Sequence, residues 1–344
     1  MRLSQSFFIK NKKISENSPV YIIAEVGINH NGSKSRCLKL IREAYKSGAD
    51  AVKLQIVNPD LSYSKRHPSY KEFKNKFLSD QSIKGLIKYA NSLGMALFAT
   101  PGDFESLDRI CKLKMPAIKI SSGLLTNLPL ILEASKKKLP IILSSGMAHL
   151  NEISEAVNIC KKNQNKVAIL KCTSIYPAPK KTLNLNGINR LKNIFKIPVG
   201  YSDHAVGIEA SIYSVALGAK IVEKHFTLNK KQKGADHKIS ILPKQFREMA
   251  NKIRELEKIM GNDKLEPSKQ EKINRNYNHR KITAKIFIKK GEKITKNNIS
   301  LKRSFSKNKG IPLKYFSRII GKKTSKNISK EKIISLKDIV ISSH

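Results

Sequence analysis

Short apolar runs alternate with longer amphipathic stretches over most of the chain. Eight such runs occur, at residues 20–27, 51–57, 95–100, 117–122, 140–145, 167–173, 197–202 and 219–226. The stretches between them have helical spacing; one places apolar residues at 153, 156, 157 and 160, on a single helical face. Eight alternating strand and helix units predict an α/β fold of the (β/α)8 barrel type. A doubly wound sheet is the alternative, but no G-x-G-x-x-G motif follows the first run.

The two ends of the chain differ in pattern from the middle. Residues 1–19 are polar apart from one short apolar patch and predict an arm or a short hairpin. Residues 58–80 form a long insertion after the second run, on the catalytic rim of the predicted barrel, where long loops usually bind or cover something. We divide the chain into a catalytic barrel at 1–262, a polar linker at 263–280 and a small, mostly β domain at 281–344.

The composition excludes several classes of protein. The formal net charge is +41, but 55 of the 67 basic residues are lysines, spread singly and without interleaved aromatic residues. This pattern disfavours nucleic-acid binding, although the charge should concentrate small anionic substrates. No apolar run reaches 18 residues and no signal peptide is recognisable, so we expect a cytoplasmic protein without membrane contact. The four cysteines lack a C-x-x-C pair, which argues against a zinc knot or a disulfide framework.

Polar residues stand at the end of each apolar run, where a barrel has its active site. Lys53 and Lys119 lie inside apolar runs, where an unpaired ammonium group would cost several kcal/mol, so each indicates a nearby anion. The anion is either a ligand or a protein carboxylate; for Lys53 the structural alternative is a pair with Glu25 or Glu223. Four hydroxyl groups at other strand ends suit a phosphate or carboxylate cradle: Thr100, Ser122, Ser144 and Ser202.

His204 and His225 follow two neighbouring apolar runs, separated by one amphipathic segment. Parallel strands bring their carboxyl ends to one rim, so the two imidazoles can meet at one divalent cation. Carboxylates are frequent in the same stretch (Asp203, Glu209, Glu223 and Asp236). The alternative is that both histidines belong to the core, each capping its own strand.

Several longer motifs together resemble the sialic acid synthase family. They are AEVGINHNG (24–32), VKLQ (52–55), FATP (98–101), KISSG (119–123), SSGMA (144–148), KCTSIYPAP (171–179), GYSDHAVG (200–207) and EKHFT (223–227). The segments KKGEKIT (289–295) and LKRS…GIP (301–312) resemble the antifreeze-like (SAF) domain that ends proteins of this family. The resemblance covers nearly the whole chain after residue 20, in order.

The resemblance implies a condensation of phosphoenolpyruvate with the open-chain aldehyde of an N-acylated hexosamine, giving a 2-keto sugar acid and phosphate. It implies a divalent metal ion, Mn²⁺ or Mg²⁺, on His204 and His225, and a catalytic role for Glu25 near C2 of phosphoenolpyruvate. Its remaining implied site residues fall into two groups. Lys53, Lys119, Thr100, Ser122, Ser144 and Ser202 would hold phosphoenolpyruvate, and Gln55, Ser174, Tyr176, Asp236 and Arg303 would complete the substrate site. Arg303 would enter the neighbouring subunit's site, which implies a domain-swapped homodimer.

The chain departs from the family pattern at three positions. Leu124 stands where relatives commonly have an acidic residue that contacts sugar hydroxyls, Ser174 replaces an asparagine, and Ser304 replaces a proline. A leucine cannot accept a hydrogen bond, so we expect a 6-deoxy di-N-acylated hexose to be a candidate acceptor beside N-acetylmannosamine. The rival functions are another phosphoenolpyruvate-dependent 2-keto sugar acid synthase on the same fold, and a non-catalytic carbohydrate- or nucleic-acid-binding protein.

Overall fold

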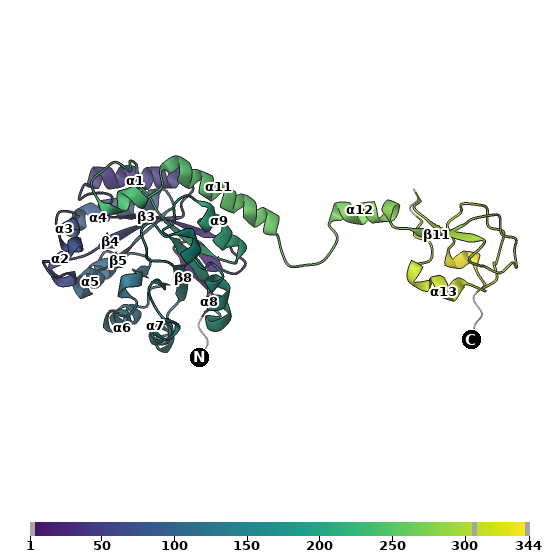
Figure 1. The fold of residues 1–344 in the computed structure, drawn as a ribbon, viewed down its shortest axis with the longest axis horizontal. Helices are drawn as coiled ribbons and strands as arrows, with labels where there is room; N and C mark the ends of the chain where they lie inside the picture. Colours follow the sequence, from purple (N-terminus) through teal and green to yellow (C-terminus); the bar gives the residue numbers. More distant parts are fainter. Residues whose placement is uncertain (1–3, 305–307, 341–344) are drawn as a thin grey trace. The chain divides into compact units, whose positions relative to one another are not determined.

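Eight parallel strands close into a barrel in the computed structural model, which describes residues 4–304 and 308–340 (Figure 1). Their order around the barrel is the order of the sequence, and the last strand pairs with the first. The strands are β3 (Tyr21–Gly27), β4 (Ala51–Ile56), β5 (Ala96–Pro101), β6 (Ile118–Ile120), β7 (Ile141–Ser144), β8 (Val167–Cys172), β9 (Val199–Asp203) and β10 (Ile221–His225). The predicted (β/α)8 fold is confirmed, with one strand at each apolar run.

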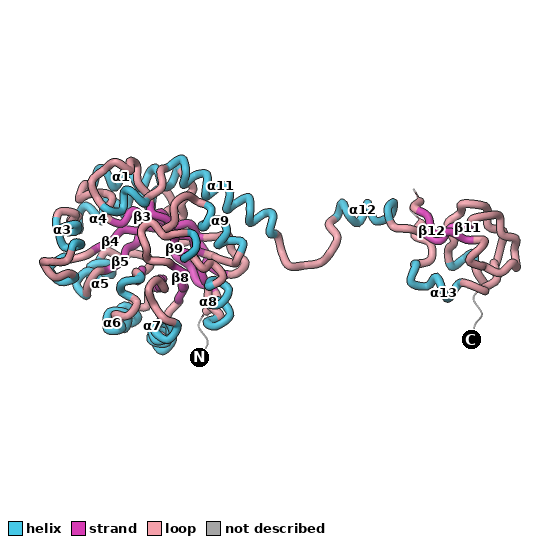
Figure 2. Tube along the Cα trace, in the orientation of Figure 1, coloured by secondary structure: helices cyan, strands magenta, loops and turns pink. Residues whose placement is uncertain are grey.

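Helices surround the strands on the outside of the barrel, as Figure 2 shows. The principal ones are α1 (Lys34–Lys46), α4 (Asp80–Ser92), α5 (Phe104–Lys112), α6 (Leu128–Lys136), α7 (Leu150–Lys162), α8 (Gly187–Phe195), α9 (Glu209–Ala216) and α11 (Pro243–Met260). In α7 the four positions of the apolar pattern, Ile153, Ala156, Val157 and Cys160, are all buried. The apolar residues at helical spacing therefore correctly predicted the buried face of this helix.

Three smaller features complete the barrel unit. The strands β1 (Ser6–Ile9) and β2 (Lys12–Ser15) pair antiparallel, so the N-terminal segment is a hairpin. The insertion after β4 contains two short helices, α2 (Pro59–Ser62) and α3 (Pro68–Lys74), and α10 (Ala235–Ile239) follows β10.

The C-terminal residues form a second compact unit, from Asn262 onward. It contains α12 (Lys269–Asn278), the antiparallel strands β11 (Lys281–Ala284) and β12 (Ile299–Lys302), and the short α13 (Phe316–Ile319). Its core is separate from that of the barrel and consists of nine isoleucines and one alanine: Ile282, Ala284, Ile288, Ile294, Ile299, Ile311, Ile319, Ile328, Ile334 and Ile339. In the described part of the chain, no helix is both long and apolar enough to span a membrane.

The register of the strands fixes which residues meet at the barrel mouth. Lys53 of β4 lies opposite Glu25 of β3, and His225 of β10 lies opposite the same glutamate on its other side. Glu223 lies opposite Ser202 of β9. Residues far apart in the sequence are thereby brought to one rim.

Candidate active site

A cluster of four buried charged side chains lies inside the barrel mouth. The Nζ atom of Lys53 is 3.2 Å from Oε2 of Glu25 and 3.0 Å from Oε2 of Glu223. Lys119 lies 3.7 Å from Oε1 of the latter carboxylate. All four are at least 96% buried, so the lysine–carboxylate pairs that the sequence left open are present. They provide charges of both signs in a site largely shielded from water.

Hydroxyl groups surround this cluster. Lys119 donates to Oγ of Ser144 at 2.5 Å, and Ser202 donates to Glu223 at 2.9 Å. The hydroxyl of Thr100 is buried without a hydrogen-bond partner among the described residues. Ser122 accepts from the backbone N–H of Gly146 at 3.1 Å. The four hydroxyls predicted for an anion cradle thus lie at the carboxyl ends of their strands, and that of Thr100 is free for a ligand.

The strand end at Gly146 leaves room that a side chain would remove. A Cβ atom at this position would lie 2.2 Å from Oγ of Ser174 and 2.6 Å from Oγ of Ser122. Both distances are below any that a real Cβ atom tolerates. The glycine of the SSGMA motif therefore lets two predicted ligand-binding hydroxyls approach each other.

The charges of the cluster differ in their response to pH. Burial raises the pKa of Glu25 to about 7; Lys53 opposes this shift and Glu223 adds to it. Burial alone would also raise the pKa of Glu223, but Lys119 and Lys53 outweigh it and lower that pKa to about 2. Burial lowers the pKa of Lys119 to about 8. For Lys53 the two carboxylates outweigh burial and raise the pKa. Glu25 can therefore exchange a proton near neutral pH, while Glu223 keeps its negative charge.

The two histidines meet beside this cluster. The ring centroids of His204 and His225 are 5.4 Å apart, and the ring of Tyr176 lies 4.1 Å from that of His204. Nδ1 of His204 is 2.8 Å from the carbonyl oxygen of Thr173. Because a carbonyl only accepts, this Nδ1 carries the hydrogen, and in the neutral ring Nε2 offers its lone pair.

These residues fit a divalent metal ion held by two imidazoles. Burial, together with the neighbouring His204, holds the pKa of His225 well below its usual range, so its ring is neutral and can act as a ligand. Nδ1 of His225 is buried without a hydrogen-bond partner, 3.9 Å from the carboxylate of Asp236. Over residues 4–304 and 308–340 no group of three or more His, Cys, Asp and Glu side chains is arranged to hold a metal. Two histidines would leave the other positions for water or substrate.

Two of the residues predicted to contact the sugar, Gln55 and Asp236, lie at Gly27, at the end of β3. Nε2 of Gln55 donates to Oε1 of Glu25 at 2.8 Å, which fixes the orientation of that carboxylate. A Cβ atom at Gly27 would lie 3.1 Å from this oxygen, 3.2 Å from Gln55 and 3.3 Å from Asp236. Gly27 also has φ +52°, where glycine is favoured. Arg303 is exposed on the second unit, and its entry into a neighbouring subunit's site stays a prediction.

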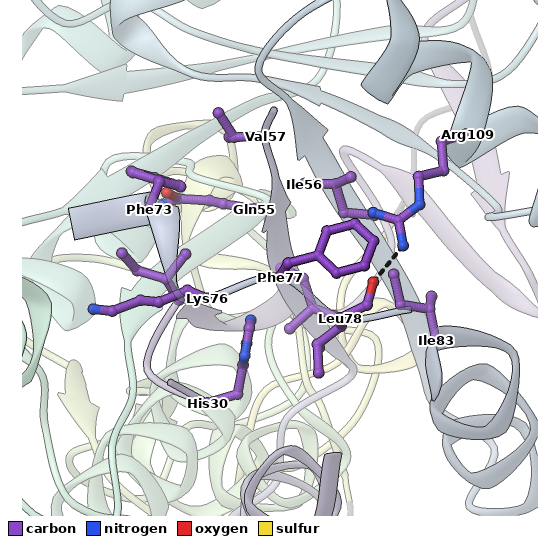
Figure 3. Close-up of a pocket in the computed structure, with 12 residues that line it drawn as sticks. His30, Gln55, Ile56, Val57, Phe73, Lys76, Phe77, Leu78, Ile83 and Arg109 are labelled. Atoms are coloured by element: carbon purple, nitrogen blue, oxygen red, sulfur yellow. Dashed lines mark hydrogen bonds between the residues drawn. The ribbon is translucent and has the colours of Figure 1, made fainter. Parts of the chain in front are cut away.

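The insertion after β4 covers one side of the mouth. The backbone N–H of Ala235, next to Asp236, lies 3.4 Å from Oε1 of Glu72 in the insertion. A small pocket lies under it, between the insertion and the barrel, with Gln55 and Lys76 among the side chains that line it (Figure 3). Gln55 thus links the pocket under the insertion to Glu25 of the candidate site.

Two contacts of the site escaped sequence reasoning. The sequence offered Glu223 as an alternative partner of Lys53, but its second contact, with Lys119, was not predicted. Cys172, buried at the end of β8, lies with its Sγ 3.7 Å from Nδ1 of His204. Burial raises the pKa of this thiol, but the contact with His204 outweighs it and the pKa falls to about 7. The alternation of side chains along β8 and β10 is the signal that could have placed both.

Comparison with known proteins agrees with the resemblance of the motifs. The N,N'-diacetyllegionaminic acid synthase of Campylobacter jejuni is 39% identical, over 91% of this chain and 98% of its own. A pseudaminic acid synthase of the same species is 33% identical, over 90% and 93%. The crystal structure of the N-acetylneuraminic acid (sialic acid) synthetase from Leptospira borgpetersenii aligns with a TM-score of 0.76 at 35% identity, covering 80% of this chain and 98% of that one. The NeuB family matches residues 40–265 and the SAF domain matches 282–340, so the chain belongs to the NeuB family and ends in a SAF domain.

Proposed function

We propose that the chain is a nonulosonic acid synthase that condenses phosphoenolpyruvate with an N-acylated hexosamine and water, releasing phosphate by cleavage of the C–O bond. The observation that carries this proposal is the cluster of four buried charges: Lys53 and Lys119 share Glu223 directly beside a carboxyl group, Glu25, whose pKa is about 7. The NeuB family membership and the synthase names of the relatives support it. The acceptor and the use of phosphoenolpyruvate belong to the proposal.

Lys53 and Lys119 would hold the negative groups of phosphoenolpyruvate. Both ammonium groups are within 4 Å of Glu223, which keeps them charged before the substrate arrives. The hydroxyls of Thr100, Ser144 and Ser202 lie on the same rim and would complete the cradle. Because these donors are already in place, little reorganisation is needed when charge develops during the reaction.

The new bond would form between C3 of phosphoenolpyruvate and the aldehyde carbon of the open-chain sugar. A metal ion on His204 and His225, Mn²⁺ or Mg²⁺, would polarise the aldehyde oxygen as a Lewis acid. Tyr176 and Asp236 lie next to these histidines and would orient the sugar. The aldehyde oxygen takes up one of the two protons that the attacking water gives up and becomes a hydroxyl group, and the other proton leaves with the phosphate.

Carbon–carbon bond formation leaves a cationic centre at C2, which water captures. Glu25 would stabilise this centre and accept a proton from the water, a role that suits a carboxyl group with a pKa near neutrality. The C2–O bond to the phosphate group then breaks, and the keto group and free phosphate result. Gln55 holds Glu25 in position throughout.

Phosphate release from phosphoenolpyruvate carrying ¹⁸O in its bridging position tests the whole proposal. We expect phosphate to form only when an N-acyl hexosamine is present, and to contain the label, since the C–O bond breaks. Label retained in the keto acid would refute this mechanism. Turnover with a phosphorylated sugar alone would favour the other keto-acid synthases. Salt-sensitive nucleic-acid binding without any phosphate release would favour a binding protein.

A further inference from the structure

A cavity of about 430 Å³ lies between the β7–α7 and β8–α8 units, next to the candidate active site. Cys172 and Ser174 line this cavity and also belong to the candidate active site, so the two adjoin each other. Cys172 approaches His204 inside the mouth, whereas Lys171 approaches Gly187, the first residue of α8. Its lining includes Ser145, Met147, Lys171, Ile175, Gly187 and Arg190. We call it the Lys171 pocket.

The positive charge of this pocket has no protein counterpart. Lys171 donates to the carbonyl of Cys172 at 3.0 Å and lies 3.4 Å from the hydroxyl of Thr173, which are neutral groups. No carboxylate lines the pocket, and within the described part of the chain neither Lys171 nor Arg190 forms an ion pair. Burial lowers the pKa of Lys171. Two cations without a counter-ion attract an anion, most strongly where water is partly excluded.

The other lysines buried at strand ends make this contrast sharper. Lys53, Lys119 and Lys224 each lie within 4 Å of a carboxylate. Lys171 is also partly removed from water, yet its two partners are neutral. Within the barrel, these three buried lysines are therefore paired with carboxylates, whereas the half-buried Lys171 has only neutral partners.

The walls of the pocket are mainly apolar and partly open to water. Met147 is 72% exposed and Ile175 is 48% exposed, which is costly for apolar side chains without a covering group. Gly187 preserves the space: a Cβ atom there would lie 3.0 Å from Cε of Lys171. The pocket thus combines a cationic end, a hydrocarbon surface and room for a small molecule.

We propose that the Lys171 pocket is a second binding site, for a small organic oxyanion that carries an apolar group. Its oxygens would accept hydrogen bonds from Lys171 and Arg190, and its hydrocarbon part would cover Met147 and Ile175. The hydroxyl of Ser145 is occupied by the carbonyl of Leu170 and would not be needed. This site goes beyond the proposed function and does not depend on the acceptor sugar or on phosphoenolpyruvate.

The ε-methyl group of Met147, which lines this pocket, reports on its occupancy. We would label the methionine methyl groups of the full chain with ¹³C, assign Met147 by Met147→Leu, and titrate with phenyl phosphate and with inorganic phosphate. We expect a saturable shift of the Met147 signal with phenyl phosphate, and binding of inorganic phosphate at least tenfold weaker because it lacks the ring. Equal affinity for the two anions would overturn the apolar part of the proposal.

Two substitutions and a matched control distinguish anion binding in the pocket from attraction by the overall positive charge of the protein. Arg190→Ala, on an exposed position of α8, and Lys171→Met should each weaken phenyl phosphate binding about tenfold or more, since each removes a charge-assisted hydrogen bond. Arg247→Ala removes an equally exposed arginine from α11 and should leave the affinity unchanged. A Met147 signal that does not move, or moves identically in Arg190→Ala, would overturn the proposal.

Discussion

Two buried lysines on the barrel, Lys53 and Lys224, show how different the uses of the same side chain can be. Both are at least 97% buried and both face carboxylates. Lys224 pairs with Asp203 at 2.9 Å and donates to the carbonyl of Ala205 at 2.6 Å. The oxygens of Asp203 also accept from Ser211 and from the backbone of Ala205. This pair is saturated within the protein.

The surroundings of Lys53 are not saturated. Its two carboxylates, Glu25 and Glu223, have pKa values displaced in opposite directions, to about 7 and about 2. The hydroxyl of Thr100 and Nδ1 of His225, on the same rim, lack hydrogen-bond partners among the described residues. A saturated buried ion pair holds strands together, whereas an unsaturated one is where a ligand can complete the bonding.

Removal of the proposed metal ion is expected to have the largest effect, because it acts only on the region around Lys53, where hydrogen-bonding groups lack partners. Excess chelator should abolish phosphate release, and Mn²⁺ or Mg²⁺ should restore it. His225→Ala should lose activity in the same way while the thermal midpoint stays within a few degrees of the wild type, because the ring is not part of the saturated pair. Full turnover in excess chelator would contradict a metal on the two histidines.

Replacing each lysine by methionine should separate activity from stability. Lys53→Met should reduce kcat/KM by about a thousandfold, because it removes a preorganised cation. It should cost little stability, because Glu25 can be protonated and Glu223 keeps Lys119 as its partner. Lys224→Met should cost about 3–5 kcal/mol of unfolding free energy, because Asp203 remains buried without a counter-ion. Denaturant titration and steady-state kinetics measure the two effects.

The control for this pair is a double variant. Asp203→Asn combined with Lys224→Met removes both charges and should recover part of the lost stability. A Lys224→Met protein as stable as the wild type would mean that the saturated pair contributes little, and the contrast between the two lysines would fail.

Much of this organisation was predictable from the sequence, for physical reasons. Eight apolar runs could be located because parallel barrel strands are buried on both faces and read as continuous apolar segments. The site residues could be proposed because the carboxyl ends of such strands meet at one rim. The pairing of Glu223 with Lys53 was one of the alternatives that the sequence left open, whereas its further contact with Lys119 was not predicted, because it depends on which side of β10 faces inward. The run AKIVEKH offers Glu223 and Lys224 as adjacent candidates for the interior.

The segment at 263–280 also contains an element that the apolar pattern did not predict. Its polar composition indicated a linker, yet α12 (Lys269–Asn278) lies within it. The helix has no buried residue, so no apolar period revealed it. Its start was readable all the same: Ser268 and Glu271 form a capping box, in which each side chain accepts from the other's backbone N–H.

Truncation tests whether the mouth is complete within the barrel unit. A chain ending at Asp263 keeps the barrel core and loses Arg303, so it should fold but show a sugar KM raised about tenfold to a hundredfold, the worth of one charge-assisted hydrogen bond. The KM for phosphoenolpyruvate should change little. Arg303→Ala in the full chain should reproduce the effect, and an unchanged sugar KM in both proteins would refute the role of Arg303 and the swapped dimer built on it.

The pH dependence should show Glu25 acting in two opposite ways. As a base with a pKa of about 7, it should make kcat/KM rise about tenfold per pH unit below neutrality and level off above it. Its ordinary pKa is 4.5, so the folded protein favours the protonated form. The resulting stabilisation is complete below pH 4.5 and is lost as pH rises through 7.

The groups that face Glu25 are Lys53 and Gln55 from β4, Glu223 from β10 and Asp236 from α10. Glu25→Gln replaces the carboxyl group by an amide of the same shape that does not titrate. Activity should therefore fall, and the free energy of unfolding should decline less between pH 5 and 7 than in the wild type. Denaturant titrations at several pH values measure this. A wild type whose stability does not decline over that range would show that another group carries the activity profile.

The smallest expected effect concerns the choice of sugar, and it depends on Leu124. This residue lies in the short turn after β6, is partly buried and packs against the barrel core, so the position offers no carboxylate to a sugar hydroxyl. A site with a buried acceptor strongly rejects sugars that lack the matching hydroxyl, whereas an apolar site discriminates by about 1–3 kcal/mol per methyl-sized difference. We therefore expect a 6-deoxy 2,4-di-N-acylated hexose to be preferred over N-acetylmannosamine by about tenfold in kcat/KM. Leu124→Glu should shift the preference toward the hydroxylated sugar and Leu124→Met should not, whereas a wild type that favours N-acetylmannosamine would refute the assignment.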